Sequence, residues 1–127
     1  MPSIPDDVRR FILTSIPSVP YLEAALLFRG QPSEQRSARD LARALYLPER
    51  AGAELLARLC AAGILQCTPD EPALYRYEPG DPTLARALDQ LAAAYADDLV
   101  GVTNLIHDAT RKNATRFADA FKLRKDS

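Results

Sequence analysis

The sequence predicts an α+β fold that is mostly helical, and three observations support this. Two short helical patterns, separated by a Leu-Pro turn, lie between residues 37 and 63. Two short strand patterns follow, joined by the polar connection TPDEP, and a long helical pattern begins at residue 81. This order of helix, turn, helix and hairpin is typical of a winged helix-turn-helix, which usually places its second helix in a DNA groove.

The segment before the motif predicts two helices. Val8 and Ile12 lie at helical spacing, which predicts a short helix over 6–14. The apolar run after Pro20 predicts a second helix, because proline suits a first helical turn. We expect this helix to end at Gly30, acting as the residue just after its last turn.

The helix-turn-helix has recognisable boundary residues. Ser37 opens the first helix with Asp40 three residues later, a variant of the capping box. Leu47 and Pro48 form the turn, and Gly63 ends the second helix, which we place near 49–62. Strands are then predicted over 64–68 and 73–78, with Tyr75 and Tyr77 on one face of the second.

An apolar seam follows the long helix that we predict over 82–110. Its spacings alternate between four and three, as in heptad repeats, and a helix of about 28 residues is ~42 Å long. Part of this length exceeds what one winged helix covers, so we expect a symmetric homodimer; burial against the same chain is the alternative. A last short helix, capped by Asn113, would add two aromatic residues. The predicted dimerisation residues are Leu84, Leu88, Leu91, Tyr95, Leu99, Val102, Ile106, Phe117 and Phe121.

Length and charge limit the organisation further. The 127 residues suit one compact domain, in which residues 1–80 form the winged helix-turn-helix and residues 81–127 the helical dimerisation segment. Residues 81–110 hold one Arg against five Asp, whereas 111–127 hold six Lys or Arg against two Asp. We expect the acidic helix and the basic tail to pack together, within or between chains. The alternative is that the tail is a phosphate-binding arm.

Composition argues against several classes of function. The net charge of −1 gives no general attraction to phosphate or to an anionic membrane. No signal-peptide pattern or apolar run of ~18 residues occurs, so we expect a cytoplasmic protein with no membrane partner. Cys60 and Cys67 are interpreted as buried free thiols; a redox pair would require the helix end and the first strand to bring them within ~7 Å.

Motifs for catalysis are missing from the sequence. There is no nucleophile–base pair, glycine-rich phosphate loop or CxxC, so we expect no enzyme activity, cofactor or metal. His107 beside Asp108 is interpreted as a surface or interface residue rather than a metal or pH-sensing site. A ligand pocket beside Tyr75 and Tyr77 would favour a small-molecule sensor that controls DNA binding.

The run SARDLARALYLPERAGAELLARLCAAGIL resembles the helix-turn-helix of small bacterial winged-helix regulators, especially the Rrf2-like and MarR-like groups. The resemblance covers residues 20–79, and it implies DNA binding by a dimer. The full chain, with its C-terminal RFADAFKLRK, is similar to small proteobacterial winged-helix proteins of unassigned role. Iron–sulfur sensors of the Rrf2-like group carry several cysteines beyond the wing. This chain has none after Cys67, so a cluster is not implied.

The outward face of the second helix is the predicted reading surface. Arg50, Glu54 and Arg58 follow at i, i+4 and i+8, and either Arg is suited to a guanine edge or a phosphate. Alternatively, Glu54 pairs with both Arg side chains and the stripe only solvates the helix. No Asn, Gln, Ser or Thr occurs between 48 and 63, so direct base readout would be limited.

The remaining candidates lie on the first helix and the wing. Arg36, Arg39 and Arg43 flank the first helix, where contacts to the DNA backbone commonly form. The wing tip carries Asp70 and Glu71, which phosphates would repel, and Arg76 is the hairpin's one basic side chain.

The sequence therefore supports two functions. One is a DNA-binding transcriptional regulator that acts as a homodimer on double-stranded DNA. The other is a winged-helix adaptor that binds a protein partner and no DNA; an internally paired stripe and a negative wing would favour it.

Overall fold

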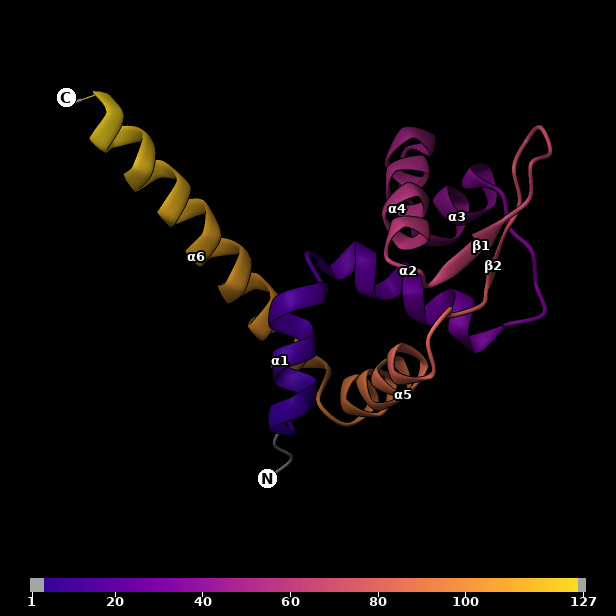
Figure 1. The fold of residues 1–127 in the computed structure, drawn as a ribbon, viewed down its shortest axis with the longest axis horizontal. Coiled ribbons are helices and arrows are strands. Elements are labelled where there is room, and N and C mark those ends of the chain that lie inside the picture. The colour runs from indigo at the N-terminus through magenta and orange to yellow at the C-terminus, as the bar shows by residue number, and fades with distance from the viewer. Residues whose placement is uncertain (1–3, 126–127) are drawn as a thin grey trace. The chain divides into compact units, whose positions relative to one another are not determined.

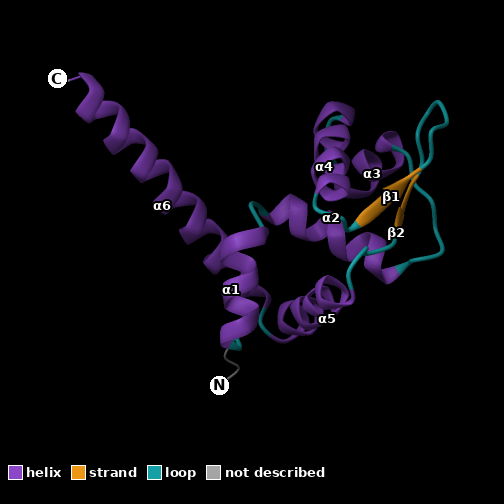
Figure 2. Cartoon of the chain, in the orientation of Figure 1, coloured by secondary structure: helices purple, strands orange, loops and turns teal. Residues whose placement is uncertain are grey.

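The computed structural model describes the backbone of residues 4–125 and the side chains of residues 4–112. The described part is mostly helical with one two-stranded antiparallel sheet, which confirms the predicted α+β winged helix-turn-helix (Figure 1, Figure 2). Its elements are α1 (Asp6–Ser15), α2 (Val19–Gly30), α3 (Ala38–Leu45), α4 (Glu49–Ala61), β1 (Leu65–Cys67), β2 (Tyr75–Tyr77), α5 (Pro82–Asp97) and α6 (Leu99–Lys125).

Contacts group the chain into two compact units. One consists of residues 1–19 and 93–127 as far as they are described, and the other of residues 20–92. The second unit contains the helix-turn-helix and the hairpin. These boundaries fall inside α2 and α5, whereas the division predicted from the sequence falls at residue 80.

The core of the second unit lies beneath the helix-turn-helix. Apolar side chains from α2, α3, α4, β1 and α5 are removed from solvent there, and burial of each large one contributes about 1.5–3 kcal/mol. The fully buried members include Leu22, Phe28, Leu41, Leu56, Leu59, Leu88 and Leu91. At the rim of this core, Nε of Arg29 on α2 donates to Oδ1 of Asp89 on α5 at 2.9 Å.

The predicted start of α3 is confirmed by its hydrogen bonds. The Asp40 N–H donates to Oγ of Ser37 at 3.2 Å, and the Ser37 N–H donates to Oδ2 of Asp40 at 3.0 Å. This reciprocal pair is a capping box with Asp in the place of the usual Glu or Gln. Helix α3 ends at Leu45, and the next residue, its C-cap Tyr46, has a φ of 57° in the left-handed region.

Helix α4 ends in a Schellman motif centred on Gly63. The Ile64 N–H donates to the Leu59 carbonyl at 3.0 Å, and the Gly63 N–H donates to the Cys60 carbonyl at 3.0 Å. Gly63 has a φ of 79°, which favours glycine because other residues meet a steric penalty there. In contrast, Gly30 is the last residue of α2 and does not have a positive φ, so it is not the left-handed cap that we expected.

The hairpin is shorter than the sequence indicates. Strands β1 and β2 have three residues each, with Leu65 opposite Tyr77 and Cys67 opposite Tyr75. An unpredicted bridge extends the sheet: the Arg36 N–H donates to the Tyr75 carbonyl at 2.9 Å, and the Tyr75 N–H donates to the Arg36 carbonyl at 2.8 Å. The segment that leads into α3 is therefore held to the wing.

In the first unit, α1 packs against α6. Among the described side chains of these helices, Val8, Ile12, Val102 and Ile106 are buried, which confirms the predicted N-terminal helix and its apolar face. Oγ1 of Thr110 donates to the carbonyl of Pro17 at 3.2 Å. Within the described residues, no single helix is both long and apolar enough to cross a membrane.

The prediction of one helix over 82–110 is wrong, because the helix is interrupted at Asp98: α5 ends at Asp97 and α6 begins at Leu99. Oδ1 of Asp98 accepts from the Gly101 N–H at 2.9 Å, so Asp98 is the N-cap of α6. The prediction of a separate last helix capped by Asn113 is also wrong, since α6 continues to Lys125. The apolar seam is thus divided between two helices, with Leu91 buried before the break and Leu99 54% exposed after it.

Candidate nucleic-acid interface

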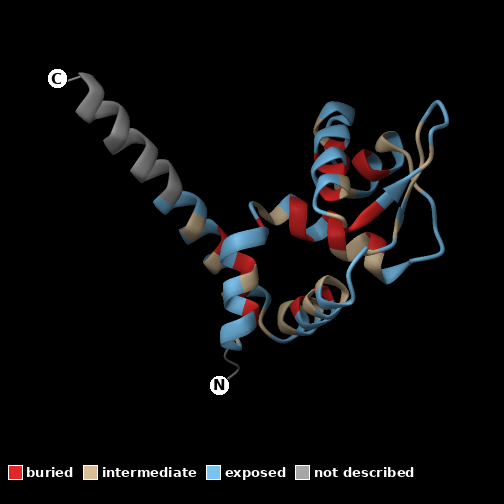
Figure 3. Cartoon of the chain, viewed as in Figure 1, coloured by how far each residue is buried: buried red, intermediate tan, exposed pale blue. Residues whose placement is uncertain are grey.

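Helix α4 has one buried and one exposed face. Gly52, Leu55, Leu56 and Leu59 are buried, while the residues between them face solvent (Figure 3). The exposed positions include Arg50, Ala53, Glu54, Ala57 and Arg58. The leucines beneath the helix therefore hold out a solvent-facing surface at the place where the sequence predicts a reading helix.

Arg50 and Glu54 form a weak ion pair on this face. Nε of Arg50 lies 3.7 Å from Oε1 of Glu54, beyond hydrogen-bonding distance, and the two side chains are 93% and 67% exposed. Such a pair contributes at most about 1 kcal/mol, so Arg50 is free to change partners. The internally paired stripe is present only in its first half, because Arg58 forms no ion pair among the described residues.

Arg58 has an electrostatic neighbour on α2. Burial raises the pKa of the Tyr21 hydroxyl above its ordinary value of 10.0, and the positive charge of Arg58 opposes that shift. Arg58 therefore lies near the solvent edge of the buried core while its own side chain stays exposed.

The arginines around α3 differ in their surroundings. Arg39 and Arg43 are exposed, whereas Arg36 is half-buried. Nη2 of Arg36 donates to Oε1 of Gln31, and its Nε is buried without a partner among the described residues. The structure thus leaves Arg39 and Arg43 on the surface and holds Arg36 beside the wing.

The wing presents carboxylates to solvent. Asp70 and Glu71 are exposed at its tip. Further down, Oε2 of Glu78 accepts from Nη2 and Nε of Arg76 at 2.8 and 3.2 Å. The pair neutralises the one cation of the hairpin, so the wing lacks the free basic side chain that a minor groove attracts.

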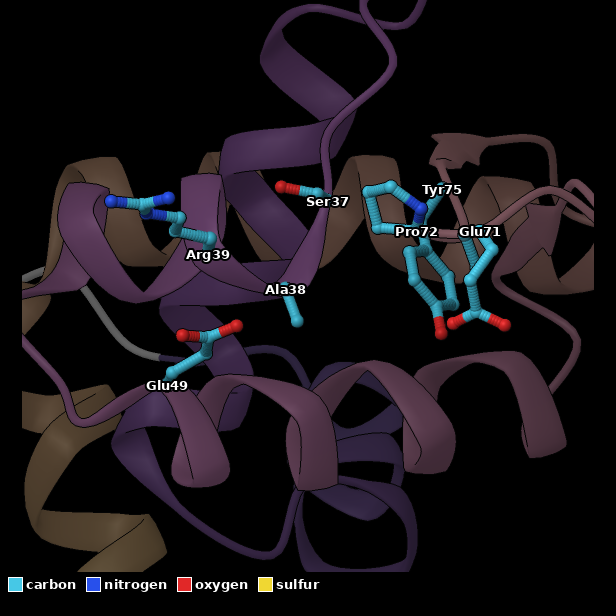
Figure 4. A pocket seen from close by; sticks show the side chains of 8 residues that line it. Ser37, Ala38, Arg39, Glu49, Glu71, Pro72 and Tyr75 are labelled. Atoms are coloured by element: carbon cyan, nitrogen blue, oxygen red, sulfur yellow. The ribbon is translucent and has the colours of Figure 1, made fainter.

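A hollow of about 430 Å³ lies between the start of α3 and the wing. Figure 4 shows Arg39 and Glu49 on one side of it and Glu71, Pro72 and Tyr75 on the other. Tyr77 does not line it. Two carboxylates and one guanidinium make its wall mixed in charge, unlike the apolar lining typical of small-molecule sites.

One feature of this region was not predicted from the sequence. Tyr46, in the turn between α3 and α4, is 95% exposed. Its position directly before the Leu-Pro turn was a signal for it, because turn residues face solvent. The two cysteines were expected to be buried free thiols, with a redox pair as the alternative. Cys60 is half-buried and Cys67 is exposed, so the expectation of burial is wrong for Cys67, and the two side chains interact. Elsewhere, His107 is exposed, and the described residues contain no group of three or more His, Cys, Asp or Glu that could hold a metal ion.

The predicted dimerisation residues have varied surroundings. Leu88, Leu91, Val102 and Ile106 are buried within the chain, Leu84 and Tyr95 are half-buried, and Leu99 is exposed. The side chains of Phe117 and Phe121, and with them the basic tail, lie outside the described residues. Dimerisation and contact with DNA both stay predictions.

The fold is similar to those of several solved structures. Wild-type MarR from E. coli in its apo form has a TM-score of 0.54 and 16% identity, covering 94% of this chain and 84% of its own. The transcriptional regulator Tm0710 from Thermotoga maritima has a TM-score of 0.54 and 14% identity, covering 94% and 82%. RV1404 from Mycobacterium tuberculosis has a TM-score of 0.54 and 13% identity, covering 95% and 80%.

No protein-family model and no curated protein sequence matches the chain. At these identities the structural matches establish the winged-helix fold alone.

Proposed function

We propose that the protein is a transcriptional regulator that binds double-stranded DNA as a homodimer. The observation that carries the proposal is the exposed face of α4, which lies above buried leucines and bears Arg50 and Arg58. Arg39 and Arg43 on α3 add two exposed cations suited to phosphate contacts. Similarity in fold to a solved transcriptional regulator supports the same conclusion.

The homodimer rests on apolar side chains of the first unit. Leu13 on α1 is 48% exposed, and Leu99 and Val100 on α6 are 54% and 65% exposed. Neighbouring exposed apolar side chains favour association. Replacing Leu99 by Asp should shift the protein towards monomer in sedimentation velocity. The control Asn104→Asp introduces the same Asp side chain at an exposed polar position of α6 and should leave the dimer intact. A dimer that survives Leu99→Asp would exclude Leu99 from the contact.

Binding to DNA is tested by its salt dependence. A fluorescent duplex of random sequence is titrated by anisotropy between about 50 and 200 mM salt, where each neutralised phosphate adds about −0.9 to the slope of log K against log salt. Replacing Arg50 and Arg58 by Ala should weaken binding and reduce the steepness of this slope by up to about two per chain.

The matched control is Arg86→Ala, which removes an exposed arginine from α5, outside the helix-turn-helix. Its slope should equal that of the wild type. If the double variant also keeps the wild-type slope, neither Arg50 nor Arg58 contacts phosphate. Glu54→Gln offers a change in the opposite direction, since it frees Arg50 from its ion pair and should strengthen binding.

The alternative is a winged-helix adaptor for a protein partner. The exposed Asp70 and Glu71 at the wing tip and the Arg76–Glu78 pair favour it, because they oppose approach to phosphate. An adaptor of this charge would show no binding to the duplex even near 50 mM salt, since non-specific affinity is mostly electrostatic.

A further inference from the structure

The two cysteines lie where the end of α4 meets the hairpin. Cys60 is half-buried in the last turn of α4, and Cys67 is the exposed last residue of β1. Helix α4 packs against β1, and Cys67 lies on the same face of its strand as the buried Leu65. Both thiols therefore belong to one junction within the second unit.

Backbone hydrogen bonds fix the chain on both sides of this junction. The Cys60 carbonyl accepts from the Gly63 N–H at 3.0 Å. This hydrogen bond fixes the backbone of Cys60 to the turn that follows α4. Cys67 is paired with Tyr75, and the next residue extends the ladder through the Thr68 N–H, which donates to the Leu74 carbonyl at 2.8 Å.

The side chains interact across the junction. Burial raises the pKa of the Cys60 thiol to about 11, and the neighbouring Cys67 adds to the shift through its charge and a side-chain hydrogen bond. Burial also raises the pKa of Tyr75, and both cysteines add to that shift. The two thiols and the Tyr75 side chain thus lie together in one small cluster.

A hollow of about 230 Å³ on the hairpin gives small molecules access to Cys67. It is lined by Cys67 together with polar groups of Gln35, Gln66, Thr68 and Arg76. Because Arg76 is paired with Glu78, the free donors here are the side-chain amides of Gln35 and Gln66. They suit the peptide amides of a small peptide-like disulfide such as oxidised glutathione.

We propose that Cys60 and Cys67 are a reversible dithiol–disulfide couple, oxidised by exchange with a small-molecule disulfide that reaches Cys67 first. The product ties the last turn of α4 to β1. This proposal is independent of DNA binding, because it concerns only the two thiols and their oxidant.

The exchange balances in two steps. The Cys67 thiolate attacks one sulfur of the small disulfide, forming a mixed disulfide and releasing one thiolate, which takes up the proton that Cys67 lost. The Cys60 thiolate then attacks Sγ of Cys67 and expels the second small thiolate, which is protonated in turn. Two electrons pass from the protein to the small disulfide, which is reduced to two thiols.

The test uses the full-length reduced protein and oxidised glutathione, followed by intact-mass spectrometry and peptide mapping after thiol alkylation. The wild type should pass through a glutathione adduct on Cys67 and end as an intrachain Cys60–Cys67 disulfide, lighter by two hydrogen atoms. Cys60→Ser should stop at the adduct, and Cys67→Ser should react far more slowly, since Cys60 is half-buried and weakly acidic.

The closing step also has a pH signature that a merely structural thiol lacks. Its rate should rise steadily from pH 7 to 9, because burial, the main cause, keeps the pKa of Cys60 above its ordinary value and its thiolate fraction still increases over this range. A wild type that retains the adduct, or that forms chains cross-linked through Cys67, would overturn the proposal. The wild-type measurement stands even if a serine variant fails to fold.

Discussion

The close crossing of α3 and α4 depends on the missing side chain of Gly52. A Cβ at this position would lie 2.9 Å from the Ala38 carbonyl oxygen and 3.2 Å from the Ala42 Cβ. A Cβ is almost never found within 3.0 Å of a non-bonded heavy atom, so α3 would have to move away from α4. Because the closest atom belongs to the backbone, a change of rotamer does not relieve the contact.

The expected cost of Gly52→Ala follows from two opposing contributions. Overpacking a tight contact typically costs 1–3 kcal/mol, whereas alanine in place of glycine inside a helix returns about 1 kcal/mol. We therefore expect the free energy of unfolding to fall by about 1 kcal/mol. Gly52→Val, which adds two further methyl groups and a poorer helix former, should be clearly less stable than Gly52→Ala.

The assay is urea denaturation followed by far-ultraviolet circular dichroism. Gly30→Ala is the matched control, because Gly30 is also helical but a Cβ there would meet nothing within 4 Å. It should leave the free energy of unfolding unchanged or raise it by up to about 1 kcal/mol. If Gly52→Ala were as stable as Gly30→Ala, the reasoning from the close crossing would be refuted.

Two further predictions concern helix caps. Asp98→Ala removes the N-cap of α6 and should cost about 1 kcal/mol in the same assay, whereas Asp97→Ala, at the exposed end of α5, should cost nothing, and equal costs would contradict the cap. Hydrogen bonds from Ser37, its backbone N–H first, hold the pKa of Asp40 below 3.8. The stabilisation by Asp40 is therefore complete above about pH 4 and is lost as pH falls through the lowered pKa. Asp40→Ala, which we expect to cost less than about 1 kcal/mol at pH 7, should match the wild type in strong acid. A difference independent of pH would refute this role of the carboxylate.

Local signals made much of the fold predictable. Ser37 and Asp40 identify the start of α3 because the capping box needs only four residues of chain, and Gly63 identifies the end of α4 for the same reason. Helical spacing likewise located α1 through Val8 and Ile12. In each case the physical cause acts within one or two helical turns.

Features that depend on competing or distant contacts were not predictable. The apolar spacing over 82–110 fits one continuous helix, yet the first helix ends before Asp98. The Asp98 carboxylate accepts from the Gly101 N–H and so caps a new helix, and the spacing of apolar residues gives no sign of this. The bridge between Arg36 and Tyr75 joins residues far apart in sequence. The contact at Gly52 has no local signal, because a glycine inside a helix usually only weakens it.

The candidate site divides in the same way. That the outer face of α4 is exposed followed from the spacing of its leucines, and the structure agrees. The pairing of its charges did not follow, because the i and i+4 spacing permits Glu54 to pair with either neighbouring Arg, whereas the structure pairs it with Arg50. Side-chain interactions at Cys60 and Cys67 required the path of the chain around Gly63, which spacing alone does not give.

The exposed charges, more than the fold, decide between regulator and adaptor. Arg39, Arg43 and Arg58 form no ion pair among the described residues, and the weak contact of Arg50 with Glu54 is readily exchanged for a phosphate. If these four cations each neutralise one phosphate, the slope of log K against log salt is about −4 for one chain and about −7 for a dimer with both helix-turn-helix motifs engaged. The wing-tip carboxylates would make either value shallower, because each repels the phosphates that the arginines attract. A steep slope therefore requires that a dimer holds both wings away from the DNA backbone, whereas a slope near zero means that the carboxylates offset the arginines, as we expect of the adaptor.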